Sequence, residues 1–450
     1  MNRREFLAGV ASTGLASAGL GASTLLRAAD PPDIALRISS VDVELAPGKI
    51  FKTTGYNGSA PGPVLRVSEG KPVTVEVHND SPIAEVVHWH GLVIPPEVDG
   101  SIEEGTPAVP PHGSRRYTFT PRPSGTRWYH THIPAGRDLK RGTYSGQFGF
   151  FYIEPTSEPA PFDGEVFVAL HGWDPYFSTG GNEESGLEVA YKRFSINSRA
   201  LGHAEPIRVK PGQRVMFRIL NADATLKHSI GLAGHTFNVV ALDGNPVPQP
   251  REVESIDLGS AERVDAIVTM NQPGVWILGE TDDRIRNAGM GVVIEYANRS
   301  GEPQWKLPGP SRWDYTAFGD ANPAPASPAE RVPLVFQQKF AGSRWVDHWT
   351  INGKEFPKTD PIRVKTNQRY RLVFDNQSDE AHPVHLHRHS FELTRFAGQA
   401  TRGVVKDVVM VPPRKQVEAD FVADNPGPSL FHCHNQMHMD FGFMTMVRYD

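Results

Sequence analysis

Cysteine is almost absent from this chain, because its 450 residues include a single one, Cys433. One thiol has no partner within the chain, so a disulfide framework is excluded as a source of stability. Long amphipathic helical patterns and runs of basic residues are also lacking, and the net charge is −5. These absences argue against a mainly helical fold and against binding to nucleic acid.

Glycine (42 residues) and proline (39 residues) are abundant, and short runs rich in valine, isoleucine, phenylalanine and tyrosine lie between turn residues. This pattern is typical of β-sandwich proteins. At roughly 100–200 residues per domain, the chain has room for three domains. The sequence therefore predicts an all-β protein with three domains.

A repeated segment supports this domain count. Its three copies begin at Pro63, Pro206 and Pro361, and each alternates like a strand before ending at an asparagine. The second and third copies align without a gap as far as Phe237 and Phe391. Repeats of this kind indicate repeated structural units.

The setting of the single cysteine is informative. It stands in His432-Cys433-His434, and His438 follows. In a strand, alternate side chains point to opposite faces, so Cys433 would face one way and its two histidine neighbours the other. Thiolate and imidazole together suit a copper ion that transfers electrons. One strand can therefore hold metal on both faces, joined by a short covalent path.

Three further His-x-His pairs lie in strand-like contexts. The four pairs are His88/His90, His130/His132, His385/His387 and His432/His434. Both imidazoles of a pair are expected on one face, close enough to bind neighbouring metal ions. Eight imidazoles suit a cluster of three copper ions. His382 precedes His385 by three residues and can join Cys433 and His438 in a trigonal His₂Cys site, the blue-copper type.

The order of these motifs resembles that of the multicopper oxidases, which include laccases and bilirubin-oxidase-like and cuprous-oxidase-like enzymes. The family pattern HxH, HxH, HxxHxH and HCHxxxH occurs here as HWH, HTH, HPVHLH and HCHNQMH, and the resemblance runs from about residue 35 to the C-terminus. It implies three consecutive cupredoxin-like Greek-key β-sandwich or barrel domains. We place them at 35–155, 160–296 and 331–450, with a linker at 297–330.

The resemblance also implies four copper ions and their ligands. Type 1 copper would be bound by His382, Cys433 and His438, and type 2 copper by His88 and His385. One type 3 copper would be bound by His90, His130 and His434, and the other by His132, His387 and His432. Because the first and last domains supply four of these eight trinuclear-site histidines each, the cluster is expected at their interface.

The middle repeat lacks the corresponding ligands. The aligned pairs are Gly231/His385, Ala233/His387, His228/His382 and His235/His389. We interpret the middle domain as a spacer that holds the copper-bearing domains at the right distance. The pairing of His235 with His389 predicts a structural role for His389.

The axial position of the type 1 site departs from some relatives, in which a methionine follows the cysteine by ten residues. Here that position is Phe443, with Met444 beside it. Phenylalanine cannot coordinate, and the loss of a weak axial thioether raises the reduction potential. We prefer the non-coordinating Phe443, and coordination by Met444 after a one-residue slip is the alternative.

The resemblance implies that a reducing substrate gives electrons to the type 1 copper near His438 or His382, and that dioxygen is reduced to water at the trinuclear cluster. Asp99 matches an acidic residue that relatives use near the type 2 copper; a simple turn aspartate before Gly100 is the alternative. Some bacterial relatives have a glutamate directly after the last type 1 histidine. Met439 stands there, and Asp440 could substitute as proton donor.

We expect phenols and aromatic amines as electron donors. Oxidation of Cu(I) or another reduced metal ion is the alternative, although the nine methionines form no methionine-rich insert. The cluster Met437, Met439, Met444 and Met446 is interpreted as packing around the copper rather than as a metal-docking site.

Three rival classes fit less well. A copper nitrite reductase has two domains and needs no set of four His-x-His pairs. A copper-free structural relative that supports cell division would lack the ligands. A copper-storage or electron-transfer protein would need the type 1 set alone.

The N-terminus predicts export. Arg3 and Arg4 precede a weakly apolar stretch to about Ala22, which resembles a twin-arginine (Tat) signal at 1–29; a membrane anchor is the alternative. The predicted location is therefore periplasmic or secreted. We expect a monomer with no membrane span once the signal is removed.

Overall fold

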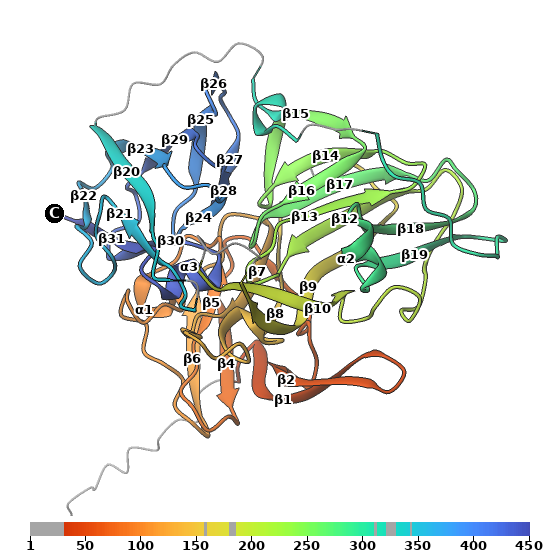
Figure 1. The fold of residues 1–450 in the computed structure, drawn as a ribbon, viewed down its shortest axis with the longest axis horizontal. Helices are drawn as coiled ribbons and strands as arrows, with labels where there is room; N and C mark the ends of the chain where they lie inside the picture. The colour runs from red at the N-terminus through yellow and green to blue at the C-terminus, as the bar shows by residue number, and fades with distance from the viewer. Residues whose placement is uncertain (1–30, 157–159, 180–185, 310–312, 321–329, 343) are drawn as a thin grey trace, which may run out of the picture. The chain divides into compact units, whose positions relative to one another are not determined.

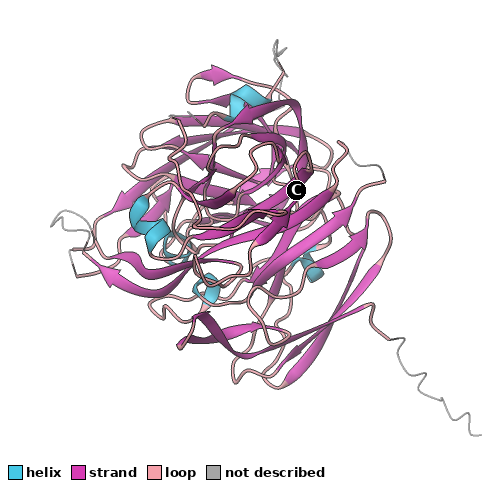
Figure 2. Ribbon diagram, turned by 90° about the vertical axis from the view of Figure 1, so that its right-hand side faces the viewer, coloured by secondary structure: helices cyan, strands magenta, loops and turns pink. Residues whose placement is uncertain are grey.

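Strands dominate the computed structural model, as Figure 2 shows, and the prediction of an all-β fold is confirmed. The structure describes residues 31–156, 160–179, 186–309, 313–320, 330–342 and 344–450. The predicted export signal and part of the predicted linker lie outside these residues. None of the helices in the described ranges is long and apolar enough to span a membrane.

Two four-stranded sheets are built from the first third of the chain (Figure 1). One sheet has the order β2 (Lys49–Tyr56), β1 (Ile34–Ala46), β4 (Val73–Asn79) and β6 (Gly113–Phe119). The other has the order β3 (Leu65–Ser68), β8 (Phe148–Glu154), β7 (Gly125–Thr131) and β5 (Val87–His90). Buried residues alternate with half-buried ones in β4, and buried or half-buried residues alternate with exposed ones in β6, because one face of this sheet packs on a core and the other lies toward solvent.

The middle third forms the next two sheets. The six-stranded sheet has the order β10 (Glu188–Ile196), β9 (Gly164–Ser178), β12 (Arg214–Asn221), β17 (Arg263–Thr269), β14 (Phe237–Leu242) and β15 (Asn245–Val253). The five-stranded sheet has the order β11 (Ile207–Val209), β19 (Gly291–Tyr296), β18 (Val275–Glu280), β13 (His228–Leu232) and β16 (Ser255–Leu258).

The last third forms the remaining two sheets. In the larger one the order is β21 (His348–Ile351), β20 (Glu330–Lys339), β23 (Arg369–Asn376), β29 (Gln416–Val422), β25 (Phe391–Phe396) and β26 (Gln399–Ala400), and β27 (Val405–Lys406) pairs with β25. In the smaller one it is β22 (Ile362–Val364), β31 (Met444–Tyr449), β30 (Ser429–Cys433), β24 (His382–Leu386) and β28 (Val408–Val411).

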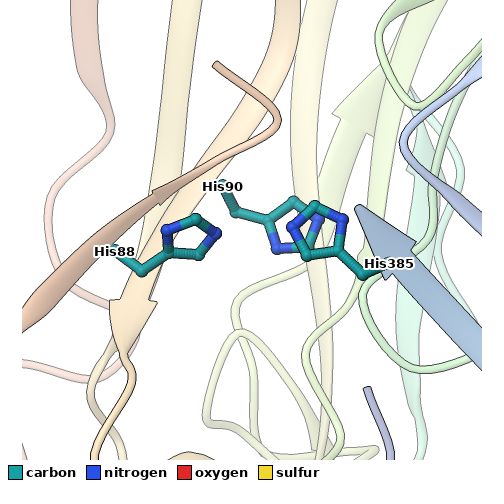
Figure 3. Close-up of side chains that lie close together, drawn as sticks. All are labelled: His88, His90 and His385. Carbon is teal, nitrogen blue, oxygen red and sulfur yellow. The ribbon is translucent and has the colours of Figure 1, made fainter. Parts of the chain in front are cut away.

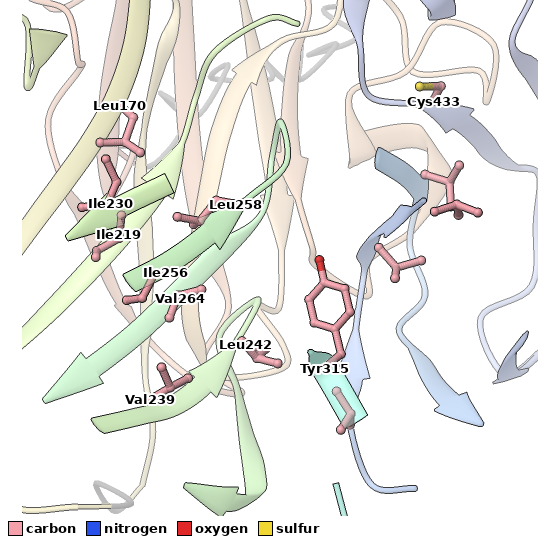
Figure 4. Packing of buried hydrophobic residues seen from close by; sticks show 14 of the residues in the cluster. Leu170, Ile219, Ile230, Val239, Leu242, Ile256, Leu258, Val264, Tyr315 and Cys433 are labelled. Carbon is pink, nitrogen blue, oxygen red and sulfur yellow. The ribbon is translucent and has the colours of Figure 1, made fainter. Parts of the chain in front are cut away.

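Short helices join these strands. They are α1 (Pro96–Asp99), η1 (Gly142–Tyr144), α2 (Asp283–Asn287), η2 (Tyr315–Phe318) and α3 (Gln436–Asp440). A continuous hydrophobic cluster extends from the middle sheets to the last third and includes Ile230, Tyr315 and Cys433 (Figure 4). The middle and last thirds are thus packed through a shared apolar core.

The sequence repeat has an exact structural counterpart in strand register. In the last third His385 lies opposite His432, and in the first third His88 lies opposite His130. At the equivalent place in the middle third, Gly231 lies opposite Gly279. Two glycines therefore occupy the positions where the other sheets pair two histidines.

The place equivalent to the His382–Cys433 pair is also filled differently in the middle third. Glu280 lies opposite Ile230, just as Cys433 lies opposite Val384 in the last third. The Oε2 atom of Glu280 lies 2.9 Å from His228 Nδ1. Asp223 Oδ2 lies 3.4 Å from His228 Nε2. Burial disfavours the charged ring, but Asp223 and Glu280 outweigh it and raise the pKa of His228 to about 9. A buried imidazolium between two carboxylates therefore takes the place of a metal site.

We expect this ion cluster to make stability depend on pH. Because the folded-state pKa of His228 is raised, its contribution is fully present below about pH 6.5 and is lost as pH rises toward 9. His228→Gln should therefore lower the free energy of unfolding at pH 6 and should do so by roughly 1–3 kcal/mol less at pH 9.5. Denaturant unfolding of both proteins at the two pH values measures this. An equal loss at both pH values would contradict a charged His228.

His235 and His389 share a second structural motif. His235 Nε2 lies 2.6 Å from Tyr296 Oη, and His389 Nε2 lies 2.7 Å from Tyr449 Oη. In both histidines Nδ1 hydrogen-bonds to the backbone oxygen two residues earlier. This geometry agrees with a structural role for His389.

Candidate metal centres

The eight histidines of the His-x-His pairs converge from two pairs of adjacent strands, β5/β7 and β24/β30, which Figure 1 shows close together. His88 and His90 both lie within β5, whereas His132, His387 and His434 directly follow the ends of β7, β24 and β30. All eight side chains are buried. Rings from the first and last thirds stack directly: His90 and His385 are 3.8 Å apart between centroids (Figure 3).

Most of these rings use one nitrogen for a hydrogen bond directed away from the cluster. The bonds are His88 Nδ1 to Asp99 O (2.9 Å), His130 Nδ1 to Thr131 O (2.8 Å), His385 Nδ1 to Asp407 O (2.7 Å), His432 Nδ1 to Cys433 O (2.9 Å), His387 Nδ1 to Asp99 Oδ2 (2.9 Å) and His90 Nε2 to Asp407 Oδ1 (3.0 Å). An acceptor at one nitrogen places the ring proton there and leaves a lone pair on the other nitrogen.

The second nitrogens point toward one another. Nε2 of His88, His132, His385 and His434 has no hydrogen-bond partner among the described residues. His387 Nε2 and His432 Nε2 are 3.0 Å apart, although both rings donate outward through Nδ1. Facing lone pairs repel unless a cation lies between them. Buried, unpartnered imidazole nitrogens of this kind are a donor set that fits copper.

The donor atoms of these histidines lie in small groups. Donor atoms lie within 4.8 Å of one another in the sets His90/His130/His434 and His132/His387/His432, and His88 and His385 form a third set with His90. Burial lowers the pKa of His385 to about 3 and that of His132 to about 4. These two rings are thus neutral near pH 7, the state in which imidazole binds metal.

His382, Cys433 and His438 form a separate buried group. Cys433 Sγ lies 3.5 Å from His438 Nδ1 and 3.8 Å from His382 Nδ1, and the two nitrogens are 3.1 Å apart. Helix α3 accounts for the spacing between Cys433 and His438. Asn435 caps α3 by accepting from the backbone N–H groups of Met437 and His438, which folds His438 back beside the cysteine.

Phe443 and Met444 point into different environments. The Phe443 ring lies 4.9 Å from the His382 ring and belongs to the same apolar cluster as Cys433. Met444 packs instead with Leu430 and Met446 in another cluster. In this structure the phenylalanine, rather than the methionine, faces the His₂Cys group.

Asp99 contacts two histidines of the cluster. Its Oδ2 is 2.9 Å from His387 Nδ1 and 3.1 Å from His88 Nδ1. Gly100, which follows with φ of 99°, allows this approach because a side chain there would meet the Val87 carbonyl oxygen. Asp99 is therefore held against the cluster rather than in an exposed turn.

Glu104 is a second acid beside the histidine cluster, and it was not predicted from the sequence. Its Oε1 lies 3.5 Å from His387 Nδ1 and accepts from the Leu430 N–H at 2.6 Å. Burial, together with the neighbouring Asp99, raises the pKa of Glu104 well above its usual range. No sequence spacing links Glu104 to a histidine, so no motif points to it.

Asp440, the other predicted proton donor, forms no hydrogen bond or ion pair with a trinuclear histidine in the described part of the chain. Its Oδ2 accepts from the backbone N–H groups of Ala135 (2.9 Å) and Gly136 (2.7 Å), and Gln436 donates to Oδ1. Burial raises the pKa of Asp440 to about 6. Its contacts join the first third to α3.

A cavity of about 130 Å³ reaches His438. Its lining includes Glu188, Asp347, Glu380 and Met437 but no lysine or arginine among the described residues. Glu380 Oε2 lies 3.2 Å from His438 Nε2, the nitrogen opposite the one that faces Cys433. His382 is fully buried, with Nε2 bonded to Ser378 Oγ. His438 is therefore the ring that a small molecule can approach.

Comparison with known proteins identifies the family of this chain. Three family models, each described as multicopper oxidase, match residues 37–158, 176–294 and 329–450. Multicopper oxidase MmcO of Mycobacterium tuberculosis is 31% identical over 439 residues, which cover 89% of this chain and 84% of the relative.

Two solved structures share the fold. The laccase of Botrytis aclada has a TM-score of 0.77 at 19% identity, covering 92% of this chain and 87% of its own. Fet3p, a multicopper oxidase that functions in iron import, has a TM-score of 0.78 at 17% identity, covering 93% and 90%. With its three matching segments and a 31% identical relative, the chain belongs to the multicopper oxidase family, the copper-dependent oxidoreductases that use dioxygen.

Proposed function

We propose that this protein is a laccase-like oxidase with one type 1, one type 2 and two type 3 copper ions, bound by the ligand sets predicted from the sequence. The inward orientation of the unpartnered imidazole nitrogens carries this proposal. Bound copper would take single electrons from the donor and pass four of them to dioxygen, giving water. The protein's own residues hold the ligands, connect the two centres and supply protons.

Cys433 provides the connection between the centres. Its thiol faces His382 and His438, while its chain neighbours His432 and His434 belong to the two type 3 sets. The path from sulfur to either imidazole follows the covalent backbone of adjacent residues. This arrangement supports electron transfer from the donor site to the oxygen site.

Asp99 is the better placed proton donor. Its carboxylate reaches His88 and His387, one from each side of the cluster, and Glu104 lies beside it. Burial and Asp99 raise the pKa of Glu104, so Glu104 can hold a proton near pH 7 beside Asp99, and this pair of carboxyl groups suits proton delivery to the cluster. The contacts of Asp440 with Ala135 and Gly136 instead favour a structural role.

We further propose that phenols and aromatic amines donate electrons at the cavity next to His438. Glu380 beside His438 Nε2 can accept a hydrogen bond from a phenol or amine group. Oxidation of a reduced metal ion is the second candidate function. The carboxylates of Glu188, Asp347 and Glu380 together with the Met437 thioether in one cavity favour it.

An absorption spectrum of the copper-loaded protein, combined with oxygen uptake, tests the proposal. We expect an intense band at about 600 nm from the copper–thiolate bond and a shoulder at about 330 nm from the type 3 pair. Oxygen uptake with a phenol would establish the laccase-like activity. Uptake with Cu(I) or Fe(II) but not with phenols would favour the second function. Loading without a blue band would contradict the type 1 site.

The axial residue should set the type 1 reduction potential. We expect Phe443→Met to lower the potential by introducing a thioether where the ring now faces His382. Met444→Leu should change it little, because Met444 packs with Leu430 and Met446. Redox titration of the blue band measures both. The reverse order of effects would assign the axial position to Met444.

The domain boundaries 35–155, 160–296 and 331–450, export through the Tat pathway and a monomeric state also belong to this proposal. The paired Arg3 and Arg4 support export. N-terminal sequencing of the exported protein and its mass in solution test these points.

A further inference from the structure

We infer that the middle third of the chain builds part of the trinuclear site, because Arg263 holds Asp407 where it orients the copper ligand His90. This inference rests on the proposed copper sites and replaces the interpretation of the middle third as a spacer. A group of buried charges lies where the three thirds of the chain meet.

Asp407 touches ligands from both copper-bearing thirds. Its carboxylate Oδ1 lies 3.0 Å from His90 Nε2, and its backbone oxygen accepts from His385 Nδ1 at 2.7 Å. Asp407 has no exposed surface. By accepting at Nε2 it keeps the His90 lone pair on Nδ1, the nitrogen that faces His130 Nε2 at 3.4 Å.

Arg263, the first residue of β17 in the middle third, binds this carboxylate through two hydrogen bonds. Arg263 Nη1 lies 2.7 Å from Asp407 Oδ1, and Nη2 lies 2.6 Å from Oδ2. The guanidinium also donates to the backbone oxygens of Ala261 (3.0 Å) and Asp243 (3.1 Å), so it is itself fixed. A planar guanidinium bound through both ends leaves the carboxylate one orientation.

The first third packs directly against this pair. Arg127 lies in β7, and its Nη1 is 3.4 Å from Asp407 Oδ2. Gly91 directly follows His90, and a Cβ there would come within 2.5 Å of Asp407 Oδ2 and 2.8 Å of Arg263 Nη2. The backbone that carries His90 therefore lies against the Arg263–Asp407 pair.

The middle third also holds the backbone of Asp407. Asp243 Oδ2 accepts from the N–H groups of Asp407 (3.3 Å) and Val408 (3.1 Å) and lies 3.0 Å from Lys406 Nζ. These groups are all buried. Buried ion pairs contribute little net stability but specify geometry when every partner is satisfied, which suits a positioning role.

The test compares Asp407→Asn with Asp265→Asn. Asp265 is also buried and also lies between the first and middle thirds, but it bonds to Thr126 Oγ1 (2.8 Å) and Arg218 Nη1 (2.9 Å) rather than to a histidine. Both variants remove one buried carboxylate charge. Copper affinity, measured by competition with a chelator, and the absorption spectrum are recorded for both and for the parent protein.

We expect Asp407→Asn to weaken copper binding at the trinuclear site by roughly 10–100-fold and to reduce the shoulder at about 330 nm. The band at about 600 nm should persist, because His382, Cys433 and His438 all come from the last third. Asp265→Asn should keep both features. Equal copper affinity and equal shoulders in the two variants would overturn the inference.

Arg263→Lys decides the question if Asp407→Asn does not fold. Lysine keeps the charge but cannot bind both carboxylate oxygens as a fork. We expect Arg263→Lys to reduce the type 3 shoulder by less than Asp407→Asn would, and to leave the blue band intact. An undiminished shoulder would overturn the inference. A parent protein without the shoulder would instead contradict the proposed copper sites.

Discussion

Cys433→Ser is expected to abolish the blue absorption band and to reduce oxygen uptake to background. The variant removes the thiolate that a type 1 copper requires and breaks the path between the two centres, while the change in side-chain volume is small. Cys433 is fully buried and contacts both His382 and His438, so no other thiol can take its place.

The spectrum provides the control for this variant. His432 and His434 keep their backbone positions, so the shoulder from the type 3 pair should remain at its parental intensity. Rapid mixing with dioxygen after chemical reduction would then show whether the trinuclear site still reacts. A variant that retained the blue band or turned over with a phenol would contradict the assignment of Cys433.

Asp99→Asn is expected to lower the turnover of the copper-loaded protein by roughly 10²–10⁴-fold while the blue band stays unchanged. Asparagine has the same shape and can accept the hydrogen bond from His387 Nδ1, but it cannot release a proton. The predicted loss therefore affects oxygen reduction, and single-turnover reduction of the type 1 centre by the donor should keep its parental rate.

Asp440→Asn is the matched comparison, because Asp440 is a second, half-buried carboxyl group close to the type 1 histidine His438 in the chain. We expect the Asp440→Asn variant to retain most of the turnover of the parent protein. If Asp440→Asn slowed oxygen reduction and Asp99→Asn did not, the proton donor would be Asp440.

The grouping of these histidines and Cys433 was predictable because it depends on local geometry. Strand alternation and motif spacing were enough to predict the His-x-His pairs, and a one-turn helix capped by Asn435 explains how His438 returns to Cys433. The resemblance of ordered motifs supplied the partition into copper types. The all-β fold followed from short apolar runs between turn residues.

Residues that hold the ligands were not predictable in the same way. Glu104 contacts His387, and Asp407 contacts His90 and Arg263, across separations in the chain of well over a hundred residues. Such contacts depend on the packing of separate sheets, which leaves no spacing pattern in the sequence. The repeat predicted that the middle third lacks ligands, but it contained no sign of the charges that Arg263 and Asp243 bring to the site.

The most direct test of this account is the crystal structure of the copper-loaded protein with anomalous diffraction at the copper absorption edge. We predict four anomalous peaks. One should lie among His382, Cys433 and His438, and the other three should lie within the cluster formed by the eight histidines of the His-x-His pairs. A single peak at Cys433, or peaks elsewhere in the molecule, would contradict the proposed centres.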